Sequence, residues 1–196
     1  TDNTAANGAG NENIVTAAAG GTISLTATAG NIGATGVGPA IDLALGDAFT
    51  ATSGEFDTAD DGIFLNVIGN IDVGAGGINS ARSIEVNATG NITNTGGSVV
   101  TLNNVNILLD SSAGAVTLSN AVTANGTGTV TLDAFGLLTV NAAVSSGTGT
   151  LTLTGGTGVT HGANGDLSTG NTTANTAISV TATTGNVSMA DGTLFN

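Results

Sequence analysis

A short pattern of alternating apolar and polar residues recurs along most of this chain and constrains its fold more than any other feature. It occurs at residues 23–26 (ISLT), 84–87 (IEVN), 116–119 (VTLS), 130–133 (VTLD) and 151–154 (LTLT). Alternation with a period of two places the apolar side chains on one face of an extended strand. Strong helix formers such as Lys, Arg and Met are almost absent. The sequence therefore predicts an all-β chain of short strands, each with one buried face.

A longer unit contains this pattern and ends in a Gly-Asn step. It covers residues 23–32, 84–92 and 178–187, and a further Gly-Asn step stands at residues 69–70. Glycine and asparagine both tolerate left-handed backbone angles, so the step predicts a corner between consecutive strands. Short strands joined by such corners can build either a parallel solenoid or an antiparallel sandwich.

The apolar positions favour the solenoid. They are nearly all Ile, Leu and Val, with Ala in the tighter places, whereas the chain has five Phe, no Trp and no Tyr. Sandwich cores usually need large aromatic side chains between their sheets. We therefore predict a right-handed parallel β-solenoid (β-helix) forming one domain over residues 1–196, with a β-sandwich as the alternative. Coils of about 20 residues, each rising about 4.8 Å, would give roughly ten coils and a rod about 50 Å long.

The charged residues and the missing cysteine exclude several function classes. One basic residue stands against 14 acidic ones, the net charge is −13, and there is no Lys and no Cys. A nucleic-acid partner is excluded because phosphate binding needs a basic surface. Disulfides and thiolate zinc sites are also excluded, and no apolar run is long enough to predict a membrane span. An acidic chain without Cys or Lys indicates an extracellular or cell-surface location.

Residues 39–67 depart from the repeat and are interpreted as an excursion from the solenoid. They hold three of the five Phe and six acidic residues. Asp57, Asp60 and Asp61 are the candidate ligands of a calcium site, and no other cofactor is predicted. A solvated acidic turn over a small Phe-anchored core is the favoured interpretation, because the segment lacks the alternating carboxylates and trailing glutamate of an EF-hand loop.

No residues indicate an enzyme. His161 is the only histidine, no Gly-x-Ser-x-Gly motif accompanies it, and we expect it at the surface or in a turn. A carboxylate pair could in principle cleave glycosides, but the aromatic and basic residues that usually line such clefts are missing. We therefore predict no catalytic residues.

Threonine recurs at the expected first outward position of several strands. Thr101, Thr117, Thr131, Thr139 and Thr152 are predicted to align as one ladder. The next outward positions are a mixture of Asn, Ser, Asp and Thr, whereas an ice-binding face would need a second matching column. The ordinary preference of strands for Thr explains the first ladder.

Strand units with Gly-Asn corners, Thr-rich outer faces and no cysteine resemble the repeat region of filamentous-haemagglutinin-like exoproteins and related bacterial surface β-solenoid adhesins. The secretion domain of that family carries an Asn-Pro motif, whereas the single proline here, Pro39, follows Gly38. The resemblance therefore covers the repeat region only. It implies a secreted, surface-associated fibre without enzymatic activity.

We expect a secreted structural protein that forms a subunit or segment of an extracellular filament or cell-surface fibre. Its partner would be further copies of itself, joined end to end, with residues 1–13 and 194–196 as caps or connections. The alternative is an adhesin that binds a glycan or a host receptor, or less readily ice. Such binding would use a side face or residues 39–67.

Overall fold

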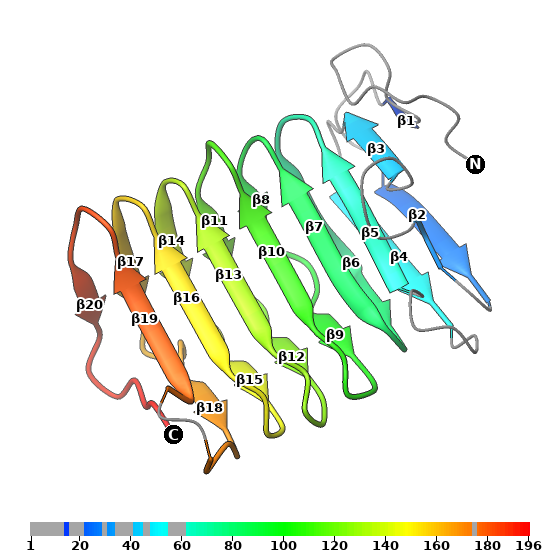
Figure 1. Cartoon of the computed structure of the whole chain (residues 1–196). Coiled ribbons are helices and arrows are strands. Elements are labelled where there is room, and N and C mark those ends of the chain that lie inside the picture. Colours follow the sequence, from blue (N-terminus) through cyan, green and yellow to red (C-terminus); the bar gives the residue numbers. More distant parts are fainter. Residues whose placement is uncertain are drawn as a thin grey trace.

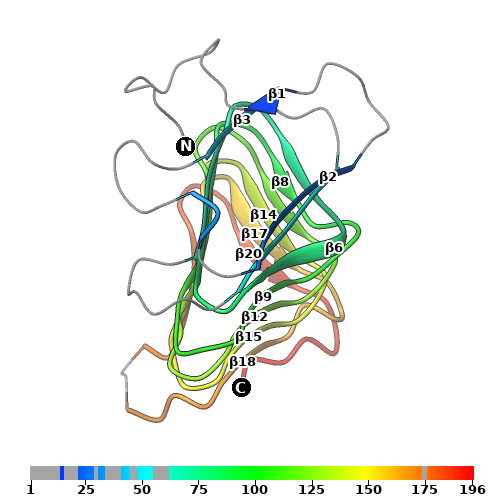
Figure 2. The ribbon, with the colours of Figure 1, turned by 90° about the vertical axis from the view of Figure 1, so that its right-hand side faces the viewer.

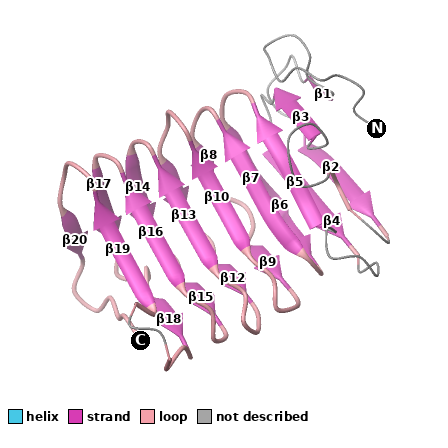
Figure 3. Ribbon diagram, in the orientation of Figure 1, coloured by secondary structure: helices cyan, strands magenta, loops and turns pink. Residues whose placement is uncertain are grey.

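The computed structural model describes residues 14–15, 22–28, 31–33, 41–44, 48–54, 62–173 and 176–196, and these form a β-solenoid. The chain winds in stacked coils, and each strand pairs with its counterpart in the next coil (Figure 1). All strand pairs of the described part are parallel, and that part contains no helix (Figure 3). The all-β solenoid prediction is confirmed, and the antiparallel sandwich alternative is wrong.

One sheet of eight strands, here called the first face, runs the length of the stack. It consists of β1 (Ile14–Val15), β3 (Ile41–Ala44), β5 (Gly62–Val67), β7 (Ser83–Ala88), β10 (Ile107–Ser111), β13 (Val130–Ala134), β16 (Leu151–Gly155) and β19 (Ile178–Ala182).

The other sheet begins with three long strands and then divides at a bend into two faces. The long strands are β2 (Thr22–Ala27), β4 (Ala48–Ser53) and β6 (Ile71–Ser80). The second face continues with β8 (Ile92–Thr93), β11 (Val116–Leu118), β14 (Leu137–Val140), β17 (Gly158–His161) and β20 (Val187–Met189). The third face continues with β9 (Val99–Thr101), β12 (Val122–Ala124), β15 (Val144–Ser146) and β18 (Leu167–Thr169). Figure 2 looks along the stack and shows the faces surrounding one interior.

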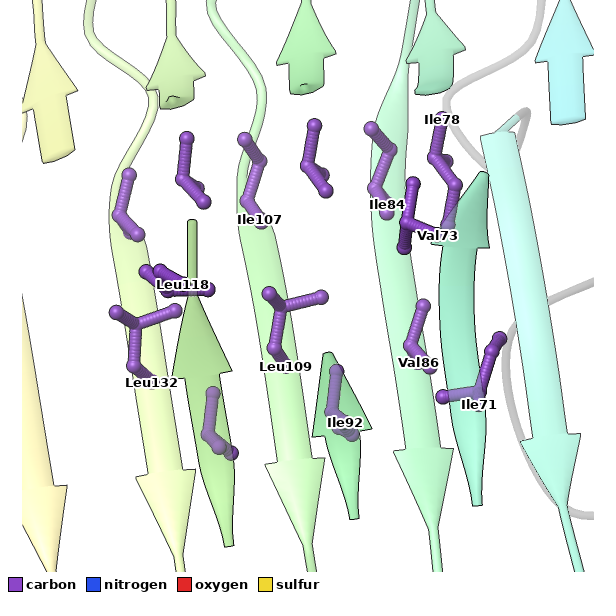
Figure 4. Close-up of a cluster of buried hydrophobic side chains, with 14 of the residues drawn as sticks. Ile71, Val73, Ile78, Ile84, Val86, Ile92, Ile107, Leu109, Leu118 and Leu132 are labelled. Carbon is purple, nitrogen blue, oxygen red and sulfur yellow. The ribbon is translucent and has the colours of Figure 1, made fainter. Parts of the chain in front are cut away.

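The interior is filled by rows of aliphatic side chains that run from coil to coil. In β7, Ile84 and Val86 are buried and point inward, while Glu85 and Asn87 are only half-buried. Ile84 is in register with Ile107, and Ile107 with Val130, so like side chains stack on one another (Figure 4). The two-residue alternation of the sequence thus becomes the inward and outward alternation of each strand.

The coils are longer than predicted, so the stack is shorter. Successive first-face positions that pair from Ile63 onward are separated by 21, 23, 23, 21 and 27 residues. Eight strands at a spacing of about 4.8 Å span about 34 Å, in place of the predicted 50 Å. The sequence estimate was wrong because it assumed uniformly short corners.

The strand around Thr101 shows a one-residue error in the predicted register. Val99 and Thr101 are buried, whereas Leu102 is 63% exposed. Because Val99 and Val100 are both apolar, the sequence is compatible with either of them pointing inward. Thr101 can point inward because its hydroxyl donates to the carbonyl of Val105 (3.3 Å). The single threonine ladder is also wrong, because the five residues lie on three faces: Thr101 on the third, Thr117 and Thr139 on the second, and Thr131 and Thr152 on the first.

The Gly-Asn steps are corners, as predicted, but asparagine serves them through its side chain. Asn70 Oδ1 accepts a hydrogen bond from the backbone N–H of Asn91, and Asn91 Oδ1 accepts one from Ala115, both at 2.8 Å. Among the described residues, only glycines have a positive φ, and Gly69 is one of them, at +95°. Asparagine therefore serves these corners without adopting the left-handed backbone that it tolerates. A Cβ on Gly90 would stand 2.6 Å from the backbone carbon of Gly69, so glycine permits the close stacking of the corners.

The described part of residues 39–67 belongs to the coils. β3 and β5 lie in the first face, paired with each other, and β4 pairs with β2 on one side and β6 on the other. The interpretation as an excursion can therefore apply only to residues of this segment outside these three strands.

Candidate assembly interface

The last described coil is formed by β19, β20 and residues 194–196. β19 pairs with β16, and β20 pairs with β17. Residues 194–196 complete the coil on β18: Asn196 N–H donates to the carbonyl of Leu167, and Thr169 N–H donates to the carbonyl of Asn196, both at 2.8 Å. No other described strand lies against these segments. Their outer edges therefore present backbone donors and acceptors to any further strand.

The inward side chains of this coil, here called the C-terminal end face, are only partly covered. Val187, Met189 and Phe195 are 43%, 48% and 38% exposed. The residues that pair with them one coil earlier, Val159, His161 and Leu167, are at most 1% exposed. The difference corresponds to the cover that a further stacked coil gives to the inward side chains of the coil before it.

The end strands also lack the devices that normally protect an open edge. Natural edge strands carry charges, Pro or bulges that prevent pairing with another chain. β19 (ISVTA), β20 (VSM) and residues 194–196 (LFN) contain no charged residue and no Pro. Nearby, the Asp166 carboxylate accepts a hydrogen bond from Leu194 N–H (2.8 Å). Asp191, in the turn between β20 and residues 194–196, is exposed and gives the last described coil a negative charge of its own.

β2 lies at the opposite end of the sheet that contains the second and third faces, and it has similar properties. β2 pairs with β4 and with no other described strand. Its inward residues Ile23, Leu25 and Ala27 are half-buried, its outward residues are exposed Thr and Ser, and it has no charge. β2, β18 and β20 are therefore the outermost described strands of this sheet, and none of them carries a charged side chain.

His161 lies directly beneath the C-terminal end face, and its predicted surface position is wrong. Its side chain is 1% exposed because β17 points Val159 and His161 inward. Nδ1 is 2.9 Å from the carbonyl oxygen of Gly165, and the ring packs edge-on against Phe195 with centroids 4.9 Å apart. Nε2 is buried without a partner. The histidine therefore supports the closing segment of the last coil.

Two aspartates lie on the side walls of the solenoid, the outward-facing surfaces of its strands, and their pKa values are shifted in opposite directions. Burial, then repulsion from Asp133 and from Glu85, raises the pKa of Asp110. Burial alone would raise the pKa of Asp72, but hydrogen bonds lower it below its ordinary value. These bonds come from Thr95 Oγ1 (2.6 Å) and N–H (3.0 Å) and from Thr93 Oγ1 (2.8 Å).

The calcium prediction is not tested by the structure. Asp57, Asp60 and Asp61 lie outside the described residues. Within the described ranges, no three His, Asp or Glu side chains are grouped closely enough to hold a metal ion.

No protein-family model, curated protein or solved structure matches the chain. The resemblance to filamentous-haemagglutinin-like repeats therefore stays a prediction. Among the described residues there is no helix with the length and apolar character needed to cross a membrane.

Proposed function

We propose that this protein is a secreted, non-catalytic structural protein that assembles through its solenoid ends into an extracellular filament or cell-surface fibre. The observation that carries the proposal is the last described coil, whose strands pair with no further described strand and whose inward residues Val187, Met189 and Phe195 are partly exposed. A further coil, supplied by a second copy, would extend every ladder of the stack and cover these residues.

The free energy of end-to-end association can be estimated from the apolar side chains that it would bury. Fully burying a Val, Met or Phe side chain contributes about 1.5–3 kcal/mol. Val187, Met189 and Phe195 are each between 38% and 48% exposed, so covering them contributes about 1 kcal/mol each. Backbone pairing along three strand edges adds to this, against an association cost of at least about 4 kcal/mol. We therefore expect assembly that depends on protein concentration.

A second candidate function is adhesion through a side wall. Thr93, Thr117, Thr139, Thr160 and Ser188 form one outward column on the second face. Hydroxyls repeated at the strand spacing of about 4.8 Å could hydrogen-bond a glycan chain. The filament is the primary proposal because the column has no charged or aromatic residue to select a ligand.

Negative-stain electron microscopy of the purified chain at several concentrations, with and without calcium, tests the filament. We expect long uniform filaments that become more abundant with concentration and with added salt, which screens the negative side walls. Short rods of one chain length at every concentration would refute end-to-end assembly.

A pair of variants of β19 makes the test specific. Val180 points inward at the end face and is half-buried, whereas Thr181 points outward and is exposed. Val180→Lys places a charge on the end face and should abolish filaments, while Thr181→Lys should retain them. Circular dichroism checks that both variants keep the native strand content.

A further inference from the structure

We propose that protonation of His161 separates the coil that contains β17 from the coil that follows it, so that this junction of the solenoid opens in mild acid. At the junction, β20 pairs with β17, and residues 194–196 pair with β18. The inference concerns contacts within one chain and does not rest on the proposed filament. Cover from a further coil would leave the imidazole as it is, because Nε2 is already enclosed by the residues around it.

His161 occupies an interior position that is apolar in the two coils before it and in the coil after it. Leu118 pairs with Val140, Val140 with His161, and His161 with Met189. Leu118 and Val140 are 0% exposed and His161 is 1% exposed, so the imidazole lies in the same aliphatic interior. One ionisable group therefore stands in a row of apolar side chains.

The surroundings of the two ring nitrogens determine where the imidazole carries its hydrogen. Nδ1 lies 2.9 Å from the carbonyl oxygen of Gly165. A carbonyl oxygen can only accept, so Nδ1 carries the hydrogen and Nε2 holds the lone pair. Nε2 is buried and has no hydrogen-bond partner among the described residues. The closed junction therefore fits the neutral imidazole.

A second proton would bind to Nε2, and no group in the site could pair with it. The carboxylates on the neighbouring turns are those of Asp166 and Asp191. Asp166 Oδ1 accepts a hydrogen bond from Leu194 N–H (2.8 Å), Asp191 is exposed, and neither is a partner of Nε2. The strands packed around the site, β14, β16, β19 and β20, contain no titratable side chain. Because burial disfavours an unpaired charge, the protonated ring is accommodated only where water reaches it.

Opening of the junction supplies that water, and acid favours the opened state. Histidine in water takes up a second proton at about pH 6.5. Below this pH the opened state binds a proton that the closed state excludes, so the balance shifts toward opening by up to about tenfold per pH unit. His161 is the only histidine of the chain. Asp110, whose pKa is raised by burial and by neighbouring carboxylates, titrates with the opposite effect, because its protonation relieves repulsion.

Two backbone hydrogen bonds report whether the junction is closed. Ala190 N–H donates to the carbonyl of His161 (2.9 Å), and Asn196 N–H donates to the carbonyl of Leu167 (2.8 Å). Both bonds join the following coil to the coil of β17 and β18. Their amide hydrogens should therefore exchange with solvent faster when the junction opens.

Hydrogen–deuterium exchange of the natural chain in dilute solution tests the proposal. Exchange is measured at about pH 7.5 and about pH 5.5, and each rate is divided by the intrinsic rate at that pH. We expect the protection of residues 187–196 to fall about tenfold or more in acid, while that of β13 changes less than about twofold. Equal protection of residues 187–196 at both pH values would overturn the proposal.

Two variants separate titration of the buried ring from other effects of acid. His161→Asn retains a side-chain donor for the Gly165 carbonyl but takes up no second proton, so its protection should be the same at both pH values. In the matched control, His161→Asn is combined with Thr160→His, which returns a histidine to the outward side of β17. This control should behave like His161→Asn. Acid opening in either variant would overturn the assignment to the buried imidazole.

The hydrogen position gives an independent measurement on the natural chain. The nitrogen-15 chemical shifts of the imidazole at about pH 7.5 should show the hydrogen on Nδ1. A hydrogen on Nε2, or on both nitrogens, would contradict the geometry from which the proposal is argued. This measurement needs no substitution, so it remains decisive if His161→Asn fails to fold.

Discussion

Asn94 is a fully buried polar side chain that links two corners of the stack, and its removal should be costly. It is 0% exposed and makes three side-chain hydrogen bonds to the next coil. Its Oδ1 accepts from the N–H groups of Ser119 (2.7 Å) and Asn120 (3.2 Å), and its Nδ2 donates to the carbonyl of Asn120 (2.7 Å). Asn94→Ala removes all three bonds at once.

The expected loss follows from the number of bonds. Each buried hydrogen bond contributes about 0.5–1.5 kcal/mol net, and a buried group left unpaired costs about 1–3 kcal/mol. Ser119 and Asn120 are partly accessible to water, so we expect Asn94→Ala to lower the free energy of unfolding by about 2–4 kcal/mol. At a urea slope of about 2 kcal/mol/M, the midpoint falls by about 1–2 M.

Urea denaturation followed by far-ultraviolet circular dichroism measures this, since the chain has no Trp or Tyr for fluorescence. Asn91→Ala is the control, because Asn91 is exposed and its side chain accepts one bond from Ala115; we expect a loss of about 0.5–1 kcal/mol. Equal midpoints for Asn94→Ala and Asn91→Ala would refute the reasoning.

A second substitution at the same position adds a pH signature. Asn94→Asp keeps both accepted bonds but turns a carboxylate oxygen toward the Asn120 carbonyl, in a site without solvent. Burial raises the pKa of the introduced carboxyl group, so its penalty is present above that raised pKa and fades as the pH falls through it. The stability of Asn94→Asp relative to the natural chain should therefore rise on acidification.

Further predictions concern charge and core packing. Asp110→Asn should raise the melting temperature slightly at pH 7, and the gain should shrink as the pH falls through the raised pKa of Asp110, because the natural carboxyl group then becomes neutral. Asp72→Asn should lower it at neutral pH, and that loss should fade as the pH falls through the lowered pKa of Asp72; a pH-independent difference in either variant would contradict the assignment. Leu132→Ala empties a 0%-exposed position and should cost about 3–4 kcal/mol in denaturant titrations, whereas Leu102→Ala, at a residue 63% exposed, should cost under about 0.5 kcal/mol.

The fold could be predicted from sequence where alternation was unambiguous. Residues 84–87 and 130–133 alternate apolar and polar side chains, and the structure buries their Ile, Val and Leu as expected. Around Thr101 two adjacent valines allowed either phase, and a hydroxyl with a local carbonyl partner decided the register. Periodicity alone cannot report such a partner, because the acceptor belongs to a turn whose geometry the sequence does not specify.

The end face was harder to predict than the strands. The residues at 194–196 could be recognised as a cap or a connection, but their pairing with β18 depends on how many residues each corner contains. His161 was expected at the surface or in a turn because no motif gave this single histidine a role, whereas β17 continues the inward alternation from Val159. Asn94 gave no signal, since it is one of many asparagines and only the corner geometry brings Ser119 and Asn120 to it.

The unequal coil lengths have a consequence for how this protein can change. The coil from Leu151 to Ile178 is six residues longer than the coil from Ile63 to Ile84, yet β16 and β19 pair in full register. Much of the added length lies in the corner between β18 and β19, where residues 174 and 175 are outside the described part, and Gly170 and Ala177 still hydrogen-bond to the preceding coil. We expect insertions and deletions in that corner to leave the stacked strands in register. New loop sequences can then be added there, by evolution or by design, while the fold is kept.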